Sequence, residues 1–200
     1  MTEVETEGVA LHAWVDESMQ MARDGHGGWY VLAAVVTEPR ACGPIREELR
    51  ELLLKGTDRL HWREESTPRH EKIASAIAGQ DVVHVVVVGA PLDSRKQERA
   101  RGICMERLLS ELEQFGVTRV WLDGRKPQLN ARDLRLVEGL RGKRAISGGI
   151  HVDFAYSRNE EMLWIPDAVA GAVSMARQGR ETHVRLAFGE LIDEIDVDVI

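Results

Sequence analysis

Residues 82–88 are the segment that most constrains the fold of this chain. Six of these seven residues are valines and the seventh is His84. A short run of this composition is typical of a strand covered on both faces, and it is far below the roughly 20 residues that a membrane span needs. The chain therefore requires a sheet with other structure packed on it. We expect His84 to be a core histidine with a hydrogen-bond partner.

Strands and helices alternate around this segment. An alternating strand at residues 11–16 ends in the polar Asp16, Glu17 and Ser18, a hairpin loop follows at 24–28, and a second strand spans 29–36. Apolar spacing predicts further strands at 117–123 and 150–156, and helices at 43–54, 67–78, 94–115, 130–140 and 159–177. This order predicts an α/β fold in which an antiparallel hairpin joins a mainly parallel sheet flanked by helices.

The length of 200 residues suits one domain spanning residues 1–200. Its core is expected at about 9–179, and residues 180–200 are a tail that forms either an edge strand or an oligomer contact. The acidic start of the chain has neither the basic nor the apolar segment of a signal peptide, which favours a cytoplasmic protein without a membrane partner. Cys42 and Cys104 are too few for a disulfide framework or a structural zinc site, so we expect buried thiols.

The charge is distributed unevenly. The whole chain carries −7, yet residues 95–144 hold 13 Lys and Arg against 7 Asp and Glu. Such a basic segment either binds a polyanion such as nucleic acid or forms ordinary solvated helix faces. Motifs of phosphate-loop, dinucleotide-binding, zinc-protease and serine-hydrolase enzymes are absent from the sequence, which excludes several large enzyme classes.

Carboxylates recur where predicted elements end or begin. Asp16 and Glu17 follow the first strand, Asp123 ends a central strand, and Asp167 lies in the last helix. Mg²⁺ prefers oxygen ligands, and a pair of such ions can hold both the attacking and the leaving oxygen of a phosphodiester. Each carboxylate also has an ordinary explanation, as part of a turn, a strand end or a helix start.

Three segments together carry a family resemblance: LHAWVDES at residues 11–18, VTRVWLDGR at 117–125 and HVDFAYSRNEEMLWIPDAVAGAV at 151–173. They resemble the uncharacterised bacterial family known as domain of unknown function 3800, which is marked by an Asp-Glu pair after the first strand and a Gln-x-x-Asp motif in a late helix. That family is similar to the ribonuclease H-like fold of integrases and resolvases. Trp164 stands where the family has its glutamine, and a tryptophan lacks the amide contacts of that residue.

The resemblance implies a ribonuclease H-like mixed sheet and a site for two Mg²⁺ or Mn²⁺ ions. In this site Asp16 bridges both metals, Asp123 and Asp167 each complete a shell, and Glu17 or Glu106 holds an outer position. The catalytic set is therefore Asp16, Glu17, Asp123 and Asp167, and Glu106 is a further metal ligand.

The predicted nucleic-acid contacts lie beside this set. Arg125, Lys126 and Arg132 follow Asp123 directly and are expected to contact flanking phosphates. His61 lies in a polar loop that suits a phosphate or a base, and its neighbour Trp62 is the expected stacking platform for a base.

The resulting hypothesis is a divalent-metal-dependent nuclease or phosphodiesterase, with nucleic acid as its partner. The alternative is an inactive scaffold of the same fold that binds nucleic acid or a protein. A third possibility, a metal-dependent enzyme acting on a small phosphorylated molecule, uses the same ligands in a closed pocket. The sequence leaves these three, and the oligomeric state, open.

Overall fold

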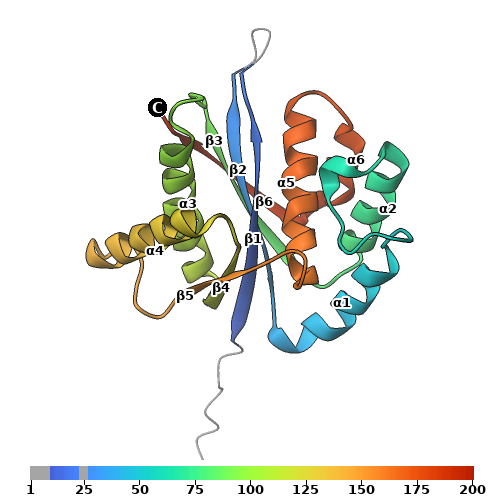
Figure 1. Ribbon diagram of the computed structural model, residues 1–200, viewed down its shortest axis with the longest axis horizontal. Helices are drawn as coiled ribbons and strands as arrows, with labels where there is room; N and C mark the ends of the chain where they lie inside the picture. Colours follow the sequence, from blue (N-terminus) through green and yellow to red (C-terminus); the bar gives the residue numbers. More distant parts are fainter. Residues whose placement is uncertain (1–9, 23–26) are drawn as a thin grey trace, which may run out of the picture.

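A computed structural model describes residues 10–22 and 27–200, and it contains a six-stranded sheet in the order β5-β4-β1-β2-β3-β6 (Figure 1). Two of the expected strand positions, those at 29–36 and 117–123, agree closely with the observed strands. The strands are β1 (Leu11–Gln20), β2 (Trp29–Thr37), β3 (Val83–Ala90), β4 (Val117–Asp123), β5 (His151–Ala155) and β6 (Ile192–Asp198).

The pairing of these strands is mixed. β1, β2 and β3 form an antiparallel meander, β4 and β5 continue the sheet parallel to β1, and β6 lies parallel to β3 at the other edge. The expected α/β class is therefore confirmed, and this topology is consistent with a ribonuclease H-like fold. The C-terminal tail supplies the edge strand β6, and because Val184 and Phe188 are also buried, the core extends beyond residue 179.

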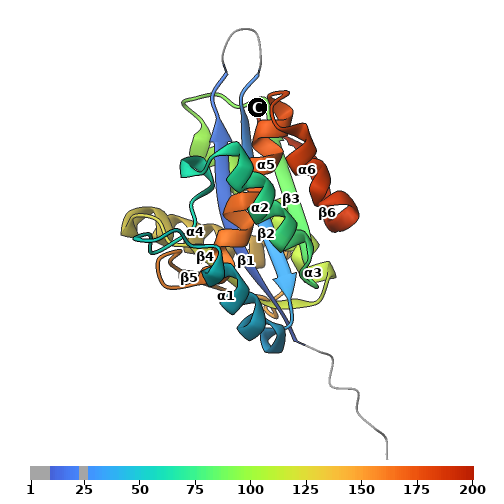
Figure 2. The same ribbon diagram turned by 90° about the vertical axis from the view of Figure 1, so that its right-hand side faces the viewer.

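Helices cover both faces of the sheet (Figures 1 and 2). Apolar side chains of α3 and α4 pack on one face, and those of α1, α2, α5 and α6 pack on the other. Figure 2 views this second layer from outside, with α2 and α5 in front of the sheet. The helices are α1 (Cys42–Glu51), α2 (Thr67–Ala78), α3 (Gln97–Gln114), α4 (Pro127–Gly142), α5 (Trp164–Arg177) and α6 (Thr182–Ala187).

The valine-rich strand β3 lies inside the sheet, as its composition predicts. Val85 and Val87 face α3, whereas Val86 and Val88 face α5 and its neighbours. This double coverage explains the lack of polar alternation in the sequence. Cys42 and Cys104 are buried free thiols, also as expected.

The surroundings of His84 differ from what we expected. The side chain is fully buried on β3 and meets the ring of Phe188 edge-on, with the centroids 5.8 Å apart. Neither ring nitrogen has a hydrogen-bond partner among residues 10–22 and 27–200, although we expected one. Burial lowers the pKa of His84 to about 4, so the ring is neutral at pH 7.

The first strand is longer than its pattern suggests. β1 continues through Asp16 and Glu17 to Gln20 because each of these residues pairs with β2. The predicted hairpin loop at 24–28 falls largely outside the described residues, since 23–26 are not among them. No helix in the described part of the chain is long and apolar enough to span a membrane.

The last long helix begins later than predicted. A 3₁₀ turn at Glu161–Leu163 precedes α5, which starts at Trp164 rather than at Asn159. Pro166 lies in the first helical turn, where its missing N–H interrupts no helical hydrogen bond. The helix therefore restarts just before the proline, and Asp167 belongs to its first turn.

Candidate carboxylate site

Asp16 and Asp123 are brought together by the pairing of β1 with β4. The parallel register pairs Trp14 with Trp121 and Val15 with Leu122, so that the two aspartates are the next residue on each strand. Side chains alternate along a strand, so Asp16 lies on the same face of the sheet as Trp14, and Asp123 lies on the same face as Trp121. Both tryptophans pack on the face that α5 covers, so the two aspartates also lie on that face.

Asp167 approaches the same place from the first turn of α5. Its Oδ2 accepts a hydrogen bond from the backbone N–H of Trp62 at 2.8 Å and lies 3.2 Å from Nδ1 of His61. Asp167 thereby ties the loop before α2 to the start of α5. The hydrogen bond to Asp167 is also the main reason why the pKa of His61 is raised.

The three aspartates line one small cavity of about 140 Å³. Its walls come from β1, β4, α5, the loop that precedes the 3₁₀ turn Trp62–Glu64, and the loop that follows β5. The lining residues are Asp16, Glu17, Arg59, Leu60, His61, Asp123, Ser157, Trp164 and Asp167.

Electrostatics in this cavity disfavour three bare negative charges. Burial raises the pKa of Asp16 well above its usual range, and the charges of Asp167 and Asp123 raise it further. Arg101 and Arg59 act in the opposite direction. Burial likewise raises the pKa of Asp123, although the N–H groups of Ser157 and Gly124 hold it down, and Ser157 N donates to Asp123 Oδ1 at 3.1 Å. The cavity is therefore suited to a positive charge.

Glu17 does not join this set through its side chain. Being next to Asp16 on a strand, it points to the other face of the sheet, where its carboxylate pairs with Arg101 of α3. The sequence placed Glu17 after the end of the strand, where this alternation would not apply. The structure thus assigns the glutamate of the Asp-Glu pair to an ion pair beneath the site.

Glu106 lies apart from the aspartates. It is exposed on α3 and lines a different cavity, together with Glu98, Arg132 and Asp133 of the α3–α4 layer. Because α3 and α5 cover opposite faces of the sheet, the structure does not bring Glu106 to Asp167.

Of the three basic residues predicted to contact phosphates, Arg125 forms ion pairs, and Lys126 and Arg132 are exposed. Arg125 donates to Glu98 Oε1 at 2.7 Å and to Asp133 Oδ1 at 2.8 Å. Arg132 is exposed, with Nε 3.8 Å from Glu98, and Lys126 is exposed at the start of α4. The Arg125 guanidinium is thus already committed to carboxylates, whereas Lys126 and Arg132 face solvent.

Trp62 is not an open stacking platform, contrary to expectation. Its side chain is only 5% exposed, and His70 stacks on it with ring centroids 3.9 Å apart. Gly171 lies against the indole, since a Cβ at this glycine would be 2.1 Å from Cδ1 of Trp62. His61 differs from Trp62, because it remains partly exposed and lines the cavity.

Trp164 also lines the cavity, and its indole N–H donates to the carbonyl oxygen of Ser157 at 2.6 Å. Because α5 begins at Trp164, this residue and Asp167 both lie in its first turn, and both border the same cavity. The indole is also buried in the core.

Arg59 is a site residue that the sequence did not reveal. It lies in the irregular segment before His61, borders the cavity, and donates to Ser157 Oγ at 3.3 Å. No periodic pattern or motif surrounds it, so local sequence carries no signal of its role.

The aspartates are not assembled as a finished ligand set. Within residues 10–22 and 27–200, no group of three or more His, Cys, Asp or Glu side chains is arranged to hold a metal ion. One oxygen of each aspartate accepts a backbone N–H: Glu17 for Asp16, Ser157 for Asp123 and Trp62 for Asp167.

Comparison with known proteins gives no family for this chain. A scan against protein-family models found no match, and a search of curated proteins found none either. The resemblance drawn from the sequence motifs therefore stays a prediction.

Proposed function

We propose that this protein is a divalent-metal-dependent phosphodiesterase that cleaves nucleic acid. The observation that carries the proposal is the convergence of Asp16, Asp123 and Asp167, from three separate elements, on one small cavity that also contains Arg59. Burial and the charges of Asp167 and Asp123 raise the pKa of Asp16, and burial raises the pKa of Asp123, so a bound cation would relieve unfavourable negative charge here.

The donor set fits Mg²⁺ or Mn²⁺ by its chemistry, because these ions prefer carboxylate oxygens. Asp16, Asp123 and Asp167 would hold the metal. Such an ion lowers the pKa of a bound water and stabilises developing negative charge on phosphate oxygens. Glu17 and Glu106 are left out of this proposed set because of where the structure puts them.

The other polar residues of the cavity have separate tasks in this proposal. The Arg59 guanidinium is placed to bind a non-bridging phosphate oxygen, since it faces the cavity without an ion-pair partner among the described residues. His61 holds Asp167 in position and is the titratable group closest to it. Ser157 fixes Asp123 through its backbone N–H.

Metal-dependent melting and cleavage test the proposal together. Millimolar Mn²⁺ should raise the melting temperature of the parent protein, because a ligand that binds only the folded state stabilises it. Asp16→Asn should remove most of that gain. It should also reduce cleavage of labelled DNA, RNA or hybrid by about 100-fold or more, since loss of an outer-shell partner alone costs about 10–100-fold.

The matched control is Asp193→Asn, which removes an exposed carboxylate from β6, at the far edge of the sheet. This variant should respond to Mn²⁺ as the parent does. A parent protein whose melting temperature ignores Mn²⁺, and which cleaves none of these substrates, would contradict the proposal.

An inactive scaffold is the second candidate, and one observation favours it. Asp167 Oδ2 already has two partners, His61 and the Trp62 N–H, so this carboxylate has a sufficient structural role without a metal. Under this alternative, Asp167→Asn lowers stability and leaves nucleic-acid or protein binding unchanged.

A further inference from the structure

Three adjoining cavities form a continuous groove that begins at the aspartates. The carboxylate cavity shares Glu17, His61 and Asp167 with a second cavity of about 240 Å³. This second cavity shares Ser18, Trp62, Arg63 and Gly171 with a third, of about 530 Å³. We call this continuous hollow the α5 groove.

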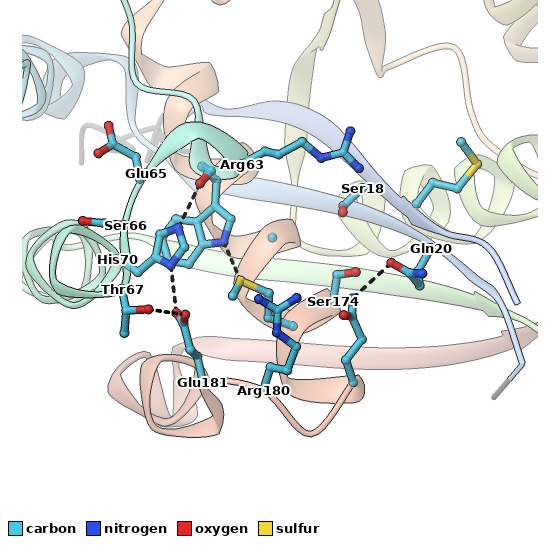
Figure 3. Close-up of a pocket in the computed structure, with 15 residues that line it drawn as sticks. Ser18, Gln20, Arg63, Glu65, Ser66, Thr67, His70, Ser174, Arg180 and Glu181 are labelled. Carbon is cyan, nitrogen blue, oxygen red and sulfur yellow. Dashed lines mark hydrogen bonds and ion pairs between the residues drawn. The ribbon is translucent and has the colours of Figure 1, made fainter. Parts of the chain in front are cut away.

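The α5 groove follows β1 and α5 away from the carboxylates. On β1 its wall runs from Asp16 to Gln20, and on α5 it runs from Asp167 to Gln178. At about 1.5 Å of rise per helical residue this path is roughly 16 Å long, several times the 3.4 Å axial spacing of phosphates along one strand of duplex DNA. At the far end, Gln178 Nε2 donates to Gln20 Oε1 at 3.2 Å (Figure 3).

Both carboxylates in the wide part of the groove, Glu65 and Glu181, have hydrogen-bond partners within the protein. Glu65 accepts a hydrogen bond from Arg69 Nε at 2.9 Å. Glu181 accepts from Thr67 Oγ1 at 2.6 Å and lies 2.8 Å from His70 Nδ1. The charge of Glu65 is therefore balanced by Arg69, whereas Glu181 keeps its negative charge, because hydrogen bonds from Thr67 and His70 favour the ionised carboxylate.

Two arginines of the wide part of the groove have no ion-pair partner among the described residues. Arg63 and Arg180 line the wide part and are exposed, and neither has a hydrogen bond or ion pair within the described ranges. In Figure 3 the Arg63 side chain extends toward Ser18, and Arg180 points into the hollow from the other side. These two arginines outnumber Glu181, the one carboxylate of the wide part without an arginine partner, so the net charge of the wide part is positive.

The aromatic surface of the groove is already occupied. His70 covers one side of Trp62, Gly171 lies against the indole, and the Trp62 N–H points to the sulfur of Met175 at 3.2 Å. Base stacking on Trp62 is therefore not available, which favours recognition of phosphates over recognition of bases.

We propose that the α5 groove binds a single polynucleotide strand through its phosphates, with Arg63 and Arg180 as the contacts. This inference rests on the proposed function in one respect, since the strand's scissile phosphodiester would lie at the aspartates. A strand suits the groove better than a mononucleotide, because the two arginines and the carboxylates are distributed along connected cavities. Binding is expected to be independent of base sequence.

Salt-dependent binding of a fluorescent (dT)12 oligonucleotide tests the proposal in Mg²⁺-free buffer. For single strands the slope of log K against log salt is about −0.7 for each phosphate neutralised. Arg63→Ala and Arg180→Ala should each flatten the slope by about 0.7 and weaken binding several-fold at low salt. (dA)12 should bind like (dT)12, and dTMP at equal phosphate concentration should compete poorly.

Arg135→Ala is the matched control, because Arg135 is an exposed arginine on α4, on the opposite face of the sheet. Its slope should equal that of the parent. An unchanged slope in Arg63→Ala and Arg180→Ala would overturn the proposal. An equal change in Arg135→Ala would also overturn it and would indicate that the strand binds on the α4 face. Effective competition by dTMP would likewise replace the strand with a small phosphorylated ligand. Unaltered melting temperatures establish that the variants are folded.

Binding and cleavage fail independently in this design. If the two variants change the salt slope but the parent never cleaves, the groove stands and the nuclease proposal falls. If the parent cleaves in an Mn²⁺-dependent way while the slopes are unchanged, the nuclease proposal stands and the groove falls.

Discussion

The indole N–H of Trp164 donates a 2.6 Å hydrogen bond to the carbonyl oxygen of Ser157. The backbone N–H of Ser157 in turn donates to Asp123. A buried aromatic side chain at the start of α5 thus fixes the loop that orients a carboxylate on β4. This arrangement gives Trp164 a polar role as well as a packing role.

Two substitutions separate the roles of Trp164. Trp164→Gln should lower the free energy of unfolding by about 3 kcal/mol, because it removes a buried aromatic ring. Trp164→Phe keeps most of the ring and should cost about 1 kcal/mol for the lost hydrogen bond. Urea unfolding measures both, and melting with and without Mn²⁺ reports on Asp123. A phenylalanine variant equal to the parent in stability and metal response would show that the bond to Ser157 has no effect.

Glu17 and Asp133 both contact the buried Arg101, but with different exposure. The Asp133 side chain is 3% exposed and the Glu17 side chain is 30% exposed. Asp133→Asn should therefore cost about 3 kcal/mol, since it leaves buried guanidinium charge uncompensated, whereas Glu17→Gln should cost about 1 kcal/mol or less. Chemical denaturation measures the two values. The Mn²⁺ response should persist in Glu17→Gln, and its loss would return this residue to the metal site.

His84 should make stability dependent on pH. Its folded pKa of about 4 lies below the ordinary 6.5, so the unfolded state binds the proton first as the pH falls. Stability is then complete above about pH 6.5 and falls by roughly 3 kcal/mol toward pH 4. In His84→Val this part of the pH dependence should vanish, as measured by urea unfolding at a series of pH values. The exposed His151→Gln serves as control, and a His84→Val profile parallel to that of the parent would contradict the prediction.

Gly171 permits the close contact between α5 and Trp62. A Cβ at this position would lie 2.1 Å from the indole, so Gly171→Ala must displace Trp62 and the adjoining His61. We expect a loss of about 1–3 kcal/mol from overpacking, together with weaker binding in the α5 groove. Thermal melting measures the first effect. Gly139→Ala on α4, where a Cβ would meet nothing within 4 Å, is the control and should be neutral or slightly stabilising.

Much of the fold could be predicted because it is encoded in local periodicity. The valine run of β3, the alternating first half of β1, the short apolar segment of β4 and the apolar stripe of α3 each match the element they form. The alternation of strands and helices then restricts the sheet to a few topologies. The lack of a hydrogen-bond partner for His84 among the described residues could not be predicted in the same way, because hydrogen-bond satisfaction depends on residues that are distant in sequence.

The carboxylates show where prediction from sequence ends. By itself the sequence determined that Asp16, Asp123 and Asp167 belong to three separate elements, since residue type and periodicity are local properties. Only the tertiary structure decided that β1 continues past Asp16, which sends Glu17 to the opposite face and into an ion pair with Arg101. It also decided that Arg59 borders the carboxylate cavity and that Trp62 is covered by His70. The physical reason is that irregular loops carry no repeat, so that their side chains are positioned by packing against elements far away in the chain.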